Sequence, residues 1–224
     1  MKHTQILLAF LLAVLGNYEF SQSADDEFAR SVSTLRNVGS EGEGNVAASQ
    51  ATLAPLFKEV RGTLDWYCLD YWSQKLSLDI PTIKTGYSEG IRWRPQAETF
   101  LRHLNTSHLD VVLITNAHPV TLAMKAERLP LAQWFNHMVS SHDYGAPKET
   151  TRFWDTLMAE RPFDPERTLF VDDSEYVLDA ALAYGVSHLI TLRQPDSTLA
   201  PREQTRFPAI HHFEEILQGL PDID

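Results

Sequence analysis

The sequence predicts an α/β protein with a Rossmann-like parallel sheet and a small helical cap. In the second half of the chain, short apolar stretches alternate with segments of helical periodicity, which is typical of strands joined by crossover helices. Before them, residues 53–90 keep a helical spacing and carry several aromatic side chains. The 224 residues are enough for one such domain and a modest insert.

Residues 1–24 form an apolar N-terminal segment that has two interpretations. Lys2 followed by the apolar residues 6–15 resembles a secretory signal peptide, although Gln22 makes a poor cleavage site before Ala24. An unbroken apolar run is also typical of a strand buried in a parallel sheet. The segment is therefore either a degraded first strand of the core or a signal-like leader.

Residues 25–94 are expected to form the helical cap and its linker. Residues 25–52 are polar and glycine-interrupted, and they predict a loop. Apolar residues then recur at spacings of three and four, which predicts a helix: Leu53, Leu56, Phe57, Val60 and Leu64. Most aromatic residues that follow are expected to pack inside the cap, and one of them could stack on a purine. These aromatic residues are Trp66, Tyr67, Tyr71 and Trp72.

Residues 95–224 are expected to form the α/β core. Pro95 opens an amphipathic helix that runs through Phe100 and Leu104. The apolar stretches predict strands at residues 109–115, 135–140, 168–171 and 187–192. The helical segments lie at residues 121–127, 149–160, 175–184 and 213–217.

The overall charge limits the partners of this protein. Lys and Arg number 19 and Asp and Glu number 30, so the net charge is -11 and the surface repels nucleic acid and anionic lipid. No apolar run reaches the roughly 20 residues that a membrane-spanning helix needs. Cys68 is the sole cysteine, which favours a reducing compartment. We expect a cytoplasmic monomer or weak homo-oligomer, or an exported protein if residues 1–23 act as a signal peptide.

Polar side chains follow three of the predicted elements, where a ligand binds in parallel sheets. Thr115 and Asn116 end the strand at residues 109–115 and suit phosphate oxygens, although a helix cap is the simpler explanation. Lys148 follows a Gly-Ala-Pro turn and could neutralise a phosphate, although most such lysines are solvated. Asp172 and Asp173 follow the strand at residues 168–171, and they predict a Mg²⁺ site, helix capping, or both.

Taken in this order, the threonine, the lysine and the acidic pair resemble the motifs of the haloacid dehalogenase superfamily. The stretches at residues 63–72, 113–119 and 167–175 closely resemble the bacterial GMP/IMP 5′-nucleotidases of that superfamily. The resemblance implies hydrolysis of a small phosphomonoester, a purine nucleotide, through an aspartyl-phosphate. Asp172 and Asp173 would bind Mg²⁺. Thr115 and Lys148 would be catalytic and would hold the phosphate together with Asn116.

One family motif does not occur in the sequence. The superfamily has Asp-x-Asp-Gly-Thr on its first strand, where the first Asp attacks phosphorus and the second acts as acid and base. Here Lys2 and His3 precede an apolar run, and the Asp-x-Asp at residues 222–224 ends the chain. The start is therefore altered or truncated, or the chain is a catalytically inactive relative that still binds phosphate or nucleotide.

The remaining histidines and the cysteine give no metal site by sequence alone. The pairs His103/His108 and His137/His142 are each five residues apart, which is wrong for one helical face. Cys68 stands among apolar residues and is expected to be a small buried hydrophobe.

Overall fold

The computed structural model describes residues 5–8, 15–16, 46–86, 88–195 and 200–217, with side chains from residue 53 onward. Its main feature is a parallel sheet of six strands in the order β5-β4-β1-β6-β7-β8. In chain order the strands are β1 (Gln5–Leu8), β4 (Asp110–Thr115), β5 (His137–Ser140), β6 (Thr168–Val171), β7 (His188–Leu192) and β8 (Ala209–Ile210). The expected α/β fold with a parallel sheet is confirmed.

Strand β1 occupies the middle of this sheet. Leu8, its last residue, lies opposite Leu113 of β4 on one side and opposite Val171 of β6 on the other. Because both neighbours are parallel to it, the carboxyl end of β1 lies at the same edge as the ends of β4 and β6. The chain that continues from β1, residues 9–14, lies outside the described residues.

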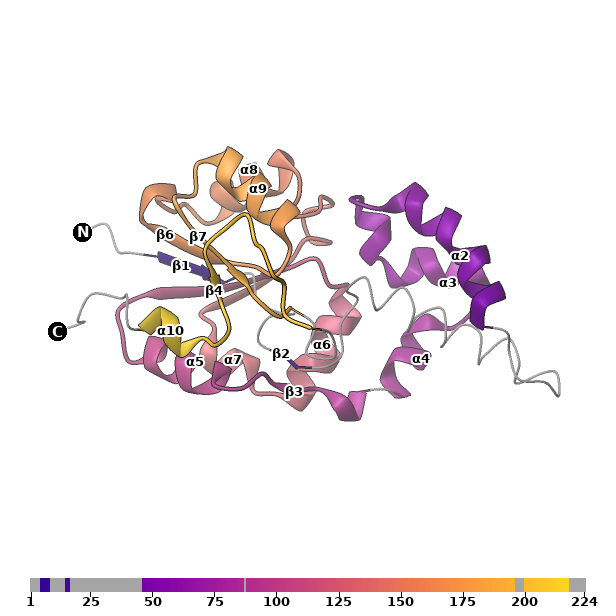
Figure 1. Ribbon diagram of the computed structural model, residues 1–224, viewed down its shortest axis with the longest axis horizontal. Coiled ribbons are helices and arrows are strands. Elements are labelled where there is room, and N and C mark those ends of the chain that lie inside the picture. Colours follow the sequence, from indigo (N-terminus) through magenta and orange to yellow (C-terminus); the bar gives the residue numbers. More distant parts are fainter. Residues whose placement is uncertain (1–4, 9–14, 17–45, 87, 196–199, 218–224) are drawn as a thin grey trace.

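Alternate residues of β4 face opposite sides of the sheet, as strand geometry requires. Val111 and Leu113 join a cluster covered by α5 (Ala97–Asn105), α6 (Pro119–Arg128), α7 (Leu131–Trp134) and α10 (Glu214–Leu217). Val112 and Ile114 join the other cluster, beneath α8 (Thr151–Glu160) and α9 (Glu175–Tyr184). Figure 1 shows these two groups of helices on either side of the sheet.

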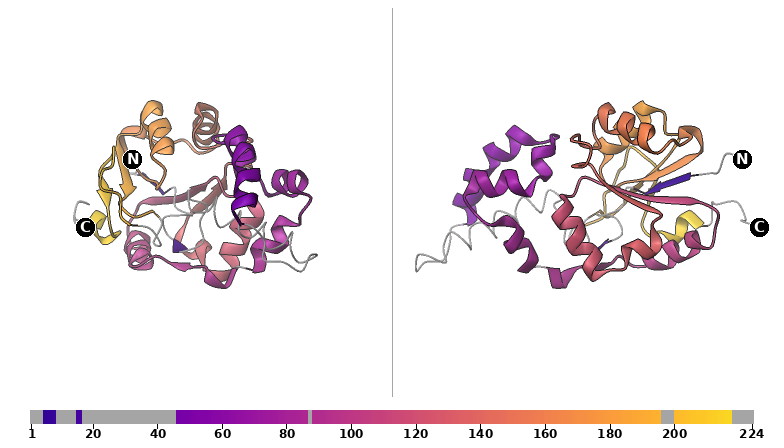
Figure 2. Two further views of the ribbon diagram at one scale, coloured as in Figure 1. Left: turned by 45° about the vertical axis from the view of Figure 1, so that its right-hand side comes forward. Right: turned by 180° about the vertical axis from the view of Figure 1, so that it is seen from behind.

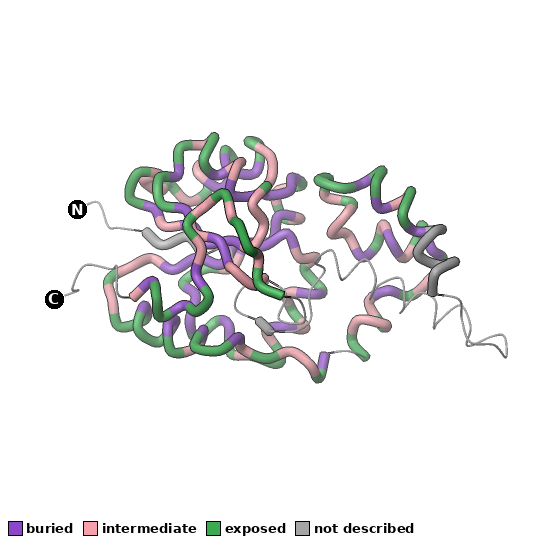
Figure 3. The backbone as a smooth tube through the Cα atoms, viewed as in Figure 1, coloured by how far each residue is buried: buried purple, intermediate pink, exposed green. Residues whose placement is uncertain are grey.

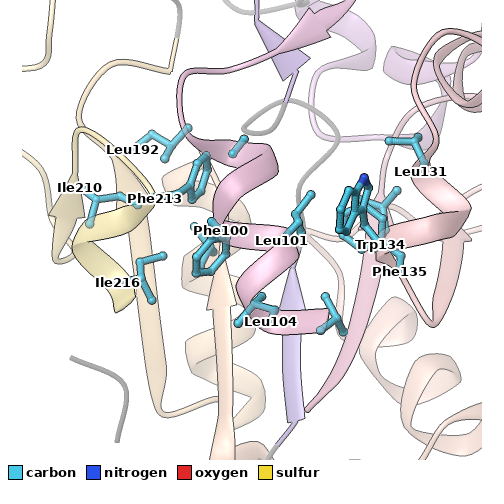
Figure 4. Close-up of a cluster of buried hydrophobic side chains, with 14 residues drawn as sticks. Phe100, Leu101, Leu104, Leu131, Trp134, Phe135, Leu192, Ile210, Phe213 and Ile216 are labelled. Carbon is cyan, nitrogen blue, oxygen red and sulfur yellow. The ribbon is translucent and has the colours of Figure 1, made fainter. Parts of the chain in front are cut away.

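Both faces are built on buried aromatic residues that are at most 2% exposed. In the first cluster the ring of Phe100 stacks on Phe213 with centroids 5.5 Å apart, and Figure 4 shows this contact with its neighbours from α5, α7 and β8. In the second cluster Trp154 of α8 meets Phe170 of β6 edge-on at 5.1 Å. Burying large aromatic residues on both faces fixes how the helices sit on the sheet, and with it the positions of the loops that follow the strands.

A separate helical body lies beside the carboxyl edge of the sheet (Figure 2). It contains α2 (Val46–Val60), the 3-10 helix η1 (Leu64–Tyr67), α3 (Leu69–Leu76) and α4 (Ile80–Gly86). Its own apolar core includes Phe57, Trp72 and Ile80, and the buried segments of Figure 3 mark this core apart from that of the sheet. The 3-10 helix η2 (Ser88–Gly90) and β3 (Arg92–Trp93), which pairs with β2 (Leu15–Gly16), lead back to α5.

Several boundaries differ from the sequence expectations. Helix α2 begins at Val46 rather than at Leu53. Its first two turns contain several alanines, which favour helix without producing an apolar stripe. The two-residue strand β8 and the four-residue α7 were not expected, because elements this short carry no periodic pattern. Within the described part of the chain, no helix is both long and apolar enough to cross a membrane.

Candidate active site

The residues singled out in the sequence lie at the carboxyl edge of the sheet. Thr115 is the last residue of β4, and Asp172 directly follows β6. Lys148 reaches the same place from the loop between β5 and α8, and its Nζ lies 2.5 Å from Oδ2 of Asp172. The three residues are buried, with at most 7% exposed, so the charges of Lys148 and Asp172 act on each other with little screening by water.

The carboxyl group of Asp172 is held on both oxygens. Oδ2 accepts the hydrogen bond from Lys148, and Oδ1 accepts one from the backbone N–H of Ser174, 2.8 Å away, where the chain turns into α9. Burial, with a smaller contribution from the neighbouring Asp173, raises the pKa of Asp172 to about 7 against the opposing effect of Lys148. A second cation beside this pair of carboxyl groups would favour their ionised forms.

Asn116 fixes the loop that carries Lys148. Its Oδ1 accepts a hydrogen bond from the backbone N–H of Lys148 at 2.9 Å, and its Nδ2 donates to Oε2 of Glu149 at 2.9 Å. Both ends of the amide side chain are therefore used to position residues 148 and 149. Thr115 Oγ1 accepts a bond from the N–H of Ala117 at 3.0 Å, which leaves its own O–H able to donate to a ligand.

Glu149 is a residue that the sequence analysis missed, and it connects the cap to the core. Tyr67, at the end of η1, donates its O–H to Oε1 of Glu149 at 2.6 Å. Burial and the Glu149 carboxylate together raise the pKa of Tyr67 well above its usual value, so the phenol stays protonated. An acidic residue after a lysine has no distinctive sequence pattern, and the tertiary structure alone identifies its partner.

The other cap aromatic residues pack within the cap. Trp72 is 4% exposed and meets Phe57 edge-on at 5.2 Å, while its indole N–H donates to the carbonyl of Trp66. Trp66 also packs edge-on against Phe57, with centroids 5.5 Å apart. Of the four aromatic residues considered, Tyr67 is the one with a hydrogen bond to the core among the described residues.

The expectation for Cys68 was wrong. Its side chain is only half-buried, and it lies close to His118 and His142 instead of an apolar environment. The three residues are far apart in the sequence and come from different elements, so spacing rules for metal ligands within one helix could not reveal the group. The sequence analysis paired His142 with His137. In the structure His142 lies close to Cys68 and His118.

The position of the missing motif is defined by the strand register. Leu8, the last residue of β1, lies opposite Val171, the residue just before Asp172, and Ala9 is the next residue of the sequence. The chain contains no Asp or Glu between Gln5 and Tyr18. A carboxylate nucleophile is therefore absent from the sequence where the family motif would supply it.

Comparison with known proteins identifies the family. A family model described as "Haloacid dehalogenase-like hydrolase" matches residues 70–191, more than half of the chain. The chain belongs to the haloacid dehalogenase-like hydrolases. It is also similar to the GMP/IMP nucleotidase YrfG of Escherichia coli (strain K12), with 37% identity over 164 residues, 73% of this chain and 74% of that protein. The YrfG of Shigella flexneri matches to the same extent.

Solved structures of the family share the fold over almost the whole chain. A HAD phosphatase from Thermococcus onnurineus superposes with a TM-score of 0.72 at 13% identity and covers 97% of both chains. The magnesium-bound HAD-hydrolase YfnB from Bacillus subtilis gives a TM-score of 0.63 at 19% identity, over 98% of this chain and 99% of that one. Together with the family match, these comparisons show that the chain has the fold of the haloacid dehalogenase-like hydrolases over nearly its whole length.

Proposed function

We propose that this protein carries the site of a Mg²⁺-dependent phosphohydrolase for purine nucleoside 5′-monophosphates. The observation that carries the proposal is the buried Lys148–Asp172 pair, with Thr115 at the same carboxyl edge of the sheet. The similarity to GMP/IMP nucleotidases supports the purine substrate. In this proposal residues 95–224 form the catalytic core, and residues 25–94 form the cap and linker that cover the bound nucleotide.

Asp172 and Asp173 are the residues that would hold Mg²⁺. Carboxylate oxygens are its preferred protein ligands, and two adjacent acids after one strand offer the charge that a divalent cation neutralises. The raised pKa of Asp172 agrees with such a role, because a buried carboxyl group gains most from a nearby cation. When bound, Mg²⁺ would supply a positive charge that screens the phosphate from these acids.

The remaining residues bind and orient the phosphate. The Thr115 hydroxyl can donate to one phosphate oxygen, and Lys148 offers a positive charge that Asp172 and the Asn116 side chain hold in place. Because the Asn116 amide already serves Lys148 and Glu149, its backbone N–H is the group left for the phosphate. These donors lie at the end of β4 and in loops anchored by the buried core, which favours precise positioning.

Hydrolysis through an aspartyl-phosphate needs a nucleophile, and the chain from Gln5 to Tyr18 has no acid to provide it. This observation favours a second candidate function, a catalytically inactive relative that binds Mg²⁺ and nucleotide. Loss of a covalent nucleophile lowers turnover by on the order of 10⁶ in a well-studied protease. We therefore expect the chain as it stands to bind GMP and to release phosphate at a rate near background.

Restoring the motif tests both functions. Ala9 follows Leu8 in the sequence as Asp172 follows Val171, the residue opposite Leu8. The substitutions Ala9→Asp, Leu11→Asp, Leu12→Gly and Ala13→Thr therefore create Asp-x-Asp-Gly-Thr in the sequence directly after β1. The matched control carries Ala9→Asn with the other three changes, so it has the shape of the motif without its nucleophile. The measurement is phosphate release from GMP with Mg²⁺, together with GMP binding to each protein.

The phosphohydrolase site is supported if all three proteins bind GMP and only the variant with Asp at position 9 turns it over. Turnover by the original chain would mean that a carboxylate elsewhere is the nucleophile, and the proposed site would be wrong. Absence of GMP binding by the original folded chain, with or without Mg²⁺, would contradict both candidate functions.

A further inference from the structure

Three side chains that commonly bind metals meet where the cap contacts the core. Cys68 is the N-cap residue of α3, His118 is the N-cap residue of α6, and His142 lies in the turn after β5. Their ligand atoms all lie within 4.8 Å of one another, and the two imidazole rings meet edge-on with centroids 4.9 Å apart. None of the three has a role in the phosphate site proposed above.

His142 presents a nitrogen that lacks a protein partner. Its Nε2 is buried and has no hydrogen bond with any residue that the structure describes. The backbone of Asn116 forms a hydrogen bond with the same ring. Because Nε2 has no partner among the described residues, this bond belongs to Nδ1. Metal-binding histidines are commonly fixed in this way, with one ring nitrogen bound to a backbone carbonyl and the lone pair of the other facing the metal.

The other two residues also have polar neighbours. Nδ1 of His118 accepts a long hydrogen bond from the N–H of Val120, 3.4 Å away, and this bond would be given up when either ring nitrogen binds a metal. The N–H of Tyr71 lies 3.4 Å from Sγ of Cys68, where it would stabilise a metal-bound thiolate. Oδ2 of Asp70 lies 3.7 Å from Nε2 of His118 and adds a negative charge beside the cluster. The cap thus contributes the sulfur and one carboxylate, and the core contributes both imidazoles.

One sulfur and two imidazole nitrogens favour Zn²⁺ and reject Mg²⁺, which prefers oxygen ligands. Zinc–sulfur and zinc–nitrogen bonds of about 2.3 and 2.1 Å place tetrahedral ligands roughly 3.5 Å apart. Side-chain movements of about 1 Å would therefore bring the present arrangement to that spacing. We propose that Cys68, His118 and His142 bind one Zn²⁺ ion that links the cap to the core, with a fourth position left for water or a ligand.

Cobalt and zinc titrations of the full-length protein test the site directly. The protein is freed of metal with a chelator and kept reduced, and Co²⁺ is added as a spectroscopic substitute for Zn²⁺. We expect the visible bands of tetrahedral Co²⁺ and a sulfur-to-cobalt charge-transfer band at one ion per chain. Zn²⁺ should abolish both, while excess Mg²⁺ should leave them unchanged.

Three variants assign the ligands. Cys68→Ser should remove the charge-transfer band, and His118→Gln and His142→Gln should each weaken Zn²⁺ binding about 100-fold or more. His137→Gln is the matched control, because this histidine is exposed and lies outside the cluster. The double change His211→Gln/His212→Gln controls for adventitious binding by neighbouring surface imidazoles. Circular dichroism checks that each variant is folded.

The single thiol offers a second readout that does not depend on the cobalt spectrum. Cys68 is the sole cysteine in the sequence, so reaction with a thiol-specific dye reports on this sulfur alone. Zn²⁺ should slow the reaction about tenfold or more in the wild type and in His137→Gln, but not in His142→Gln. A folded protein that shows no tetrahedral cobalt bands, or whose Zn²⁺ affinity is unchanged in Cys68→Ser, would overturn the proposal. Loss of binding only in the His211/His212 variant would do the same.

Discussion

Replacing Lys148 by Met removes the positive charge from a buried ion pair and leaves Asp172 without its cation. The two charged atoms lie 2.5 Å apart, and both side chains are buried. At an effective dielectric constant of about 20, such a pair attracts by about 7 kcal/mol. Part of this gain offsets desolvation, and removal of one partner of a buried pair typically costs about 3–5 kcal/mol. We expect Lys148→Met to lower the free energy of unfolding by that amount at about pH 8.

The cost should depend on pH with a definite sign. Burial raises the pKa of Asp172 to about 7 even though Lys148 opposes the shift, so without Lys148 the pKa rises further. A carboxyl group whose pKa is raised by folding destabilises the protein increasingly as pH rises from its ordinary pKa of 3.8 towards the folded value. At about pH 5.5 the carboxyl group is protonated and neutral, and the cost of Lys148→Met should shrink.

Urea unfolding at the two pH values measures this effect. Lys58→Met is the matched control, because Lys58 is exposed on α2 and its removal should cost little at either pH. The double variant Lys148→Met/Asp172→Asn should recover most of the lost stability, since neither buried charge remains. A cost that is equal at both pH values, or a double variant no more stable than Lys148→Met, would refute the electrostatic explanation.

Three further predictions concern the metal, the nucleotide and the contact between cap and core. Millimolar Mg²⁺ should raise the melting temperature relative to EDTA in the wild type but not in Asp173→Asn, and coincident wild-type melts would exclude the metal site. GMP and IMP should raise the melting temperature more than CMP and UMP. Trp72→Ala should lower stability without changing this preference, because Trp72 packs against Phe57 inside the cap. Equal protection by all four nucleotides would contradict purine specificity. Tyr67→Phe should cost about 1.5–3 kcal/mol by removing the hydrogen bond to Glu149, whereas Tyr71→Phe serves as a control in the same cap. Similar unfolding free energies for these two variants would show that the Tyr67–Glu149 bond contributes nothing.

The alternation of strands and helices was enough to predict the core from the sequence. The apolar run at residues 168–171 predicted β6 at its observed residues, because a strand buried on both faces has apolar side chains along its whole length. The periodicity also placed α9 correctly, since Gly185 ends the helix in a left-handed conformation that favours glycine. Local signals of this kind depend on residues within one or two turns of each other, and the sequence contains them in full.

The same local information indicated which residues belong to the candidate site. Thr115 ends one apolar strand and Asp172 follows another, and parallel strands bring their carboxyl ends to one edge. Lys148 follows no strand directly, and its place beside Asp172 depends on a loop fixed by Asn116, which lies 32 residues earlier. The sequence was enough to predict the three residues, and the tertiary structure shows that Lys148 and Asp172 form a buried ion pair.

Contacts between distant elements were decided by the tertiary structure alone. Tyr67 meets Glu149 across 82 positions of the chain, and Cys68 approaches His118 and His142 only because the cap packs beside the loops that follow β4 and β5. The residues of such a contact have no common spacing in the sequence, because each one follows only the pattern of its own helix, strand or loop. These residues come into contact because the apolar core of the cap and that of the sheet pack separately and fix the positions of the loops that carry them.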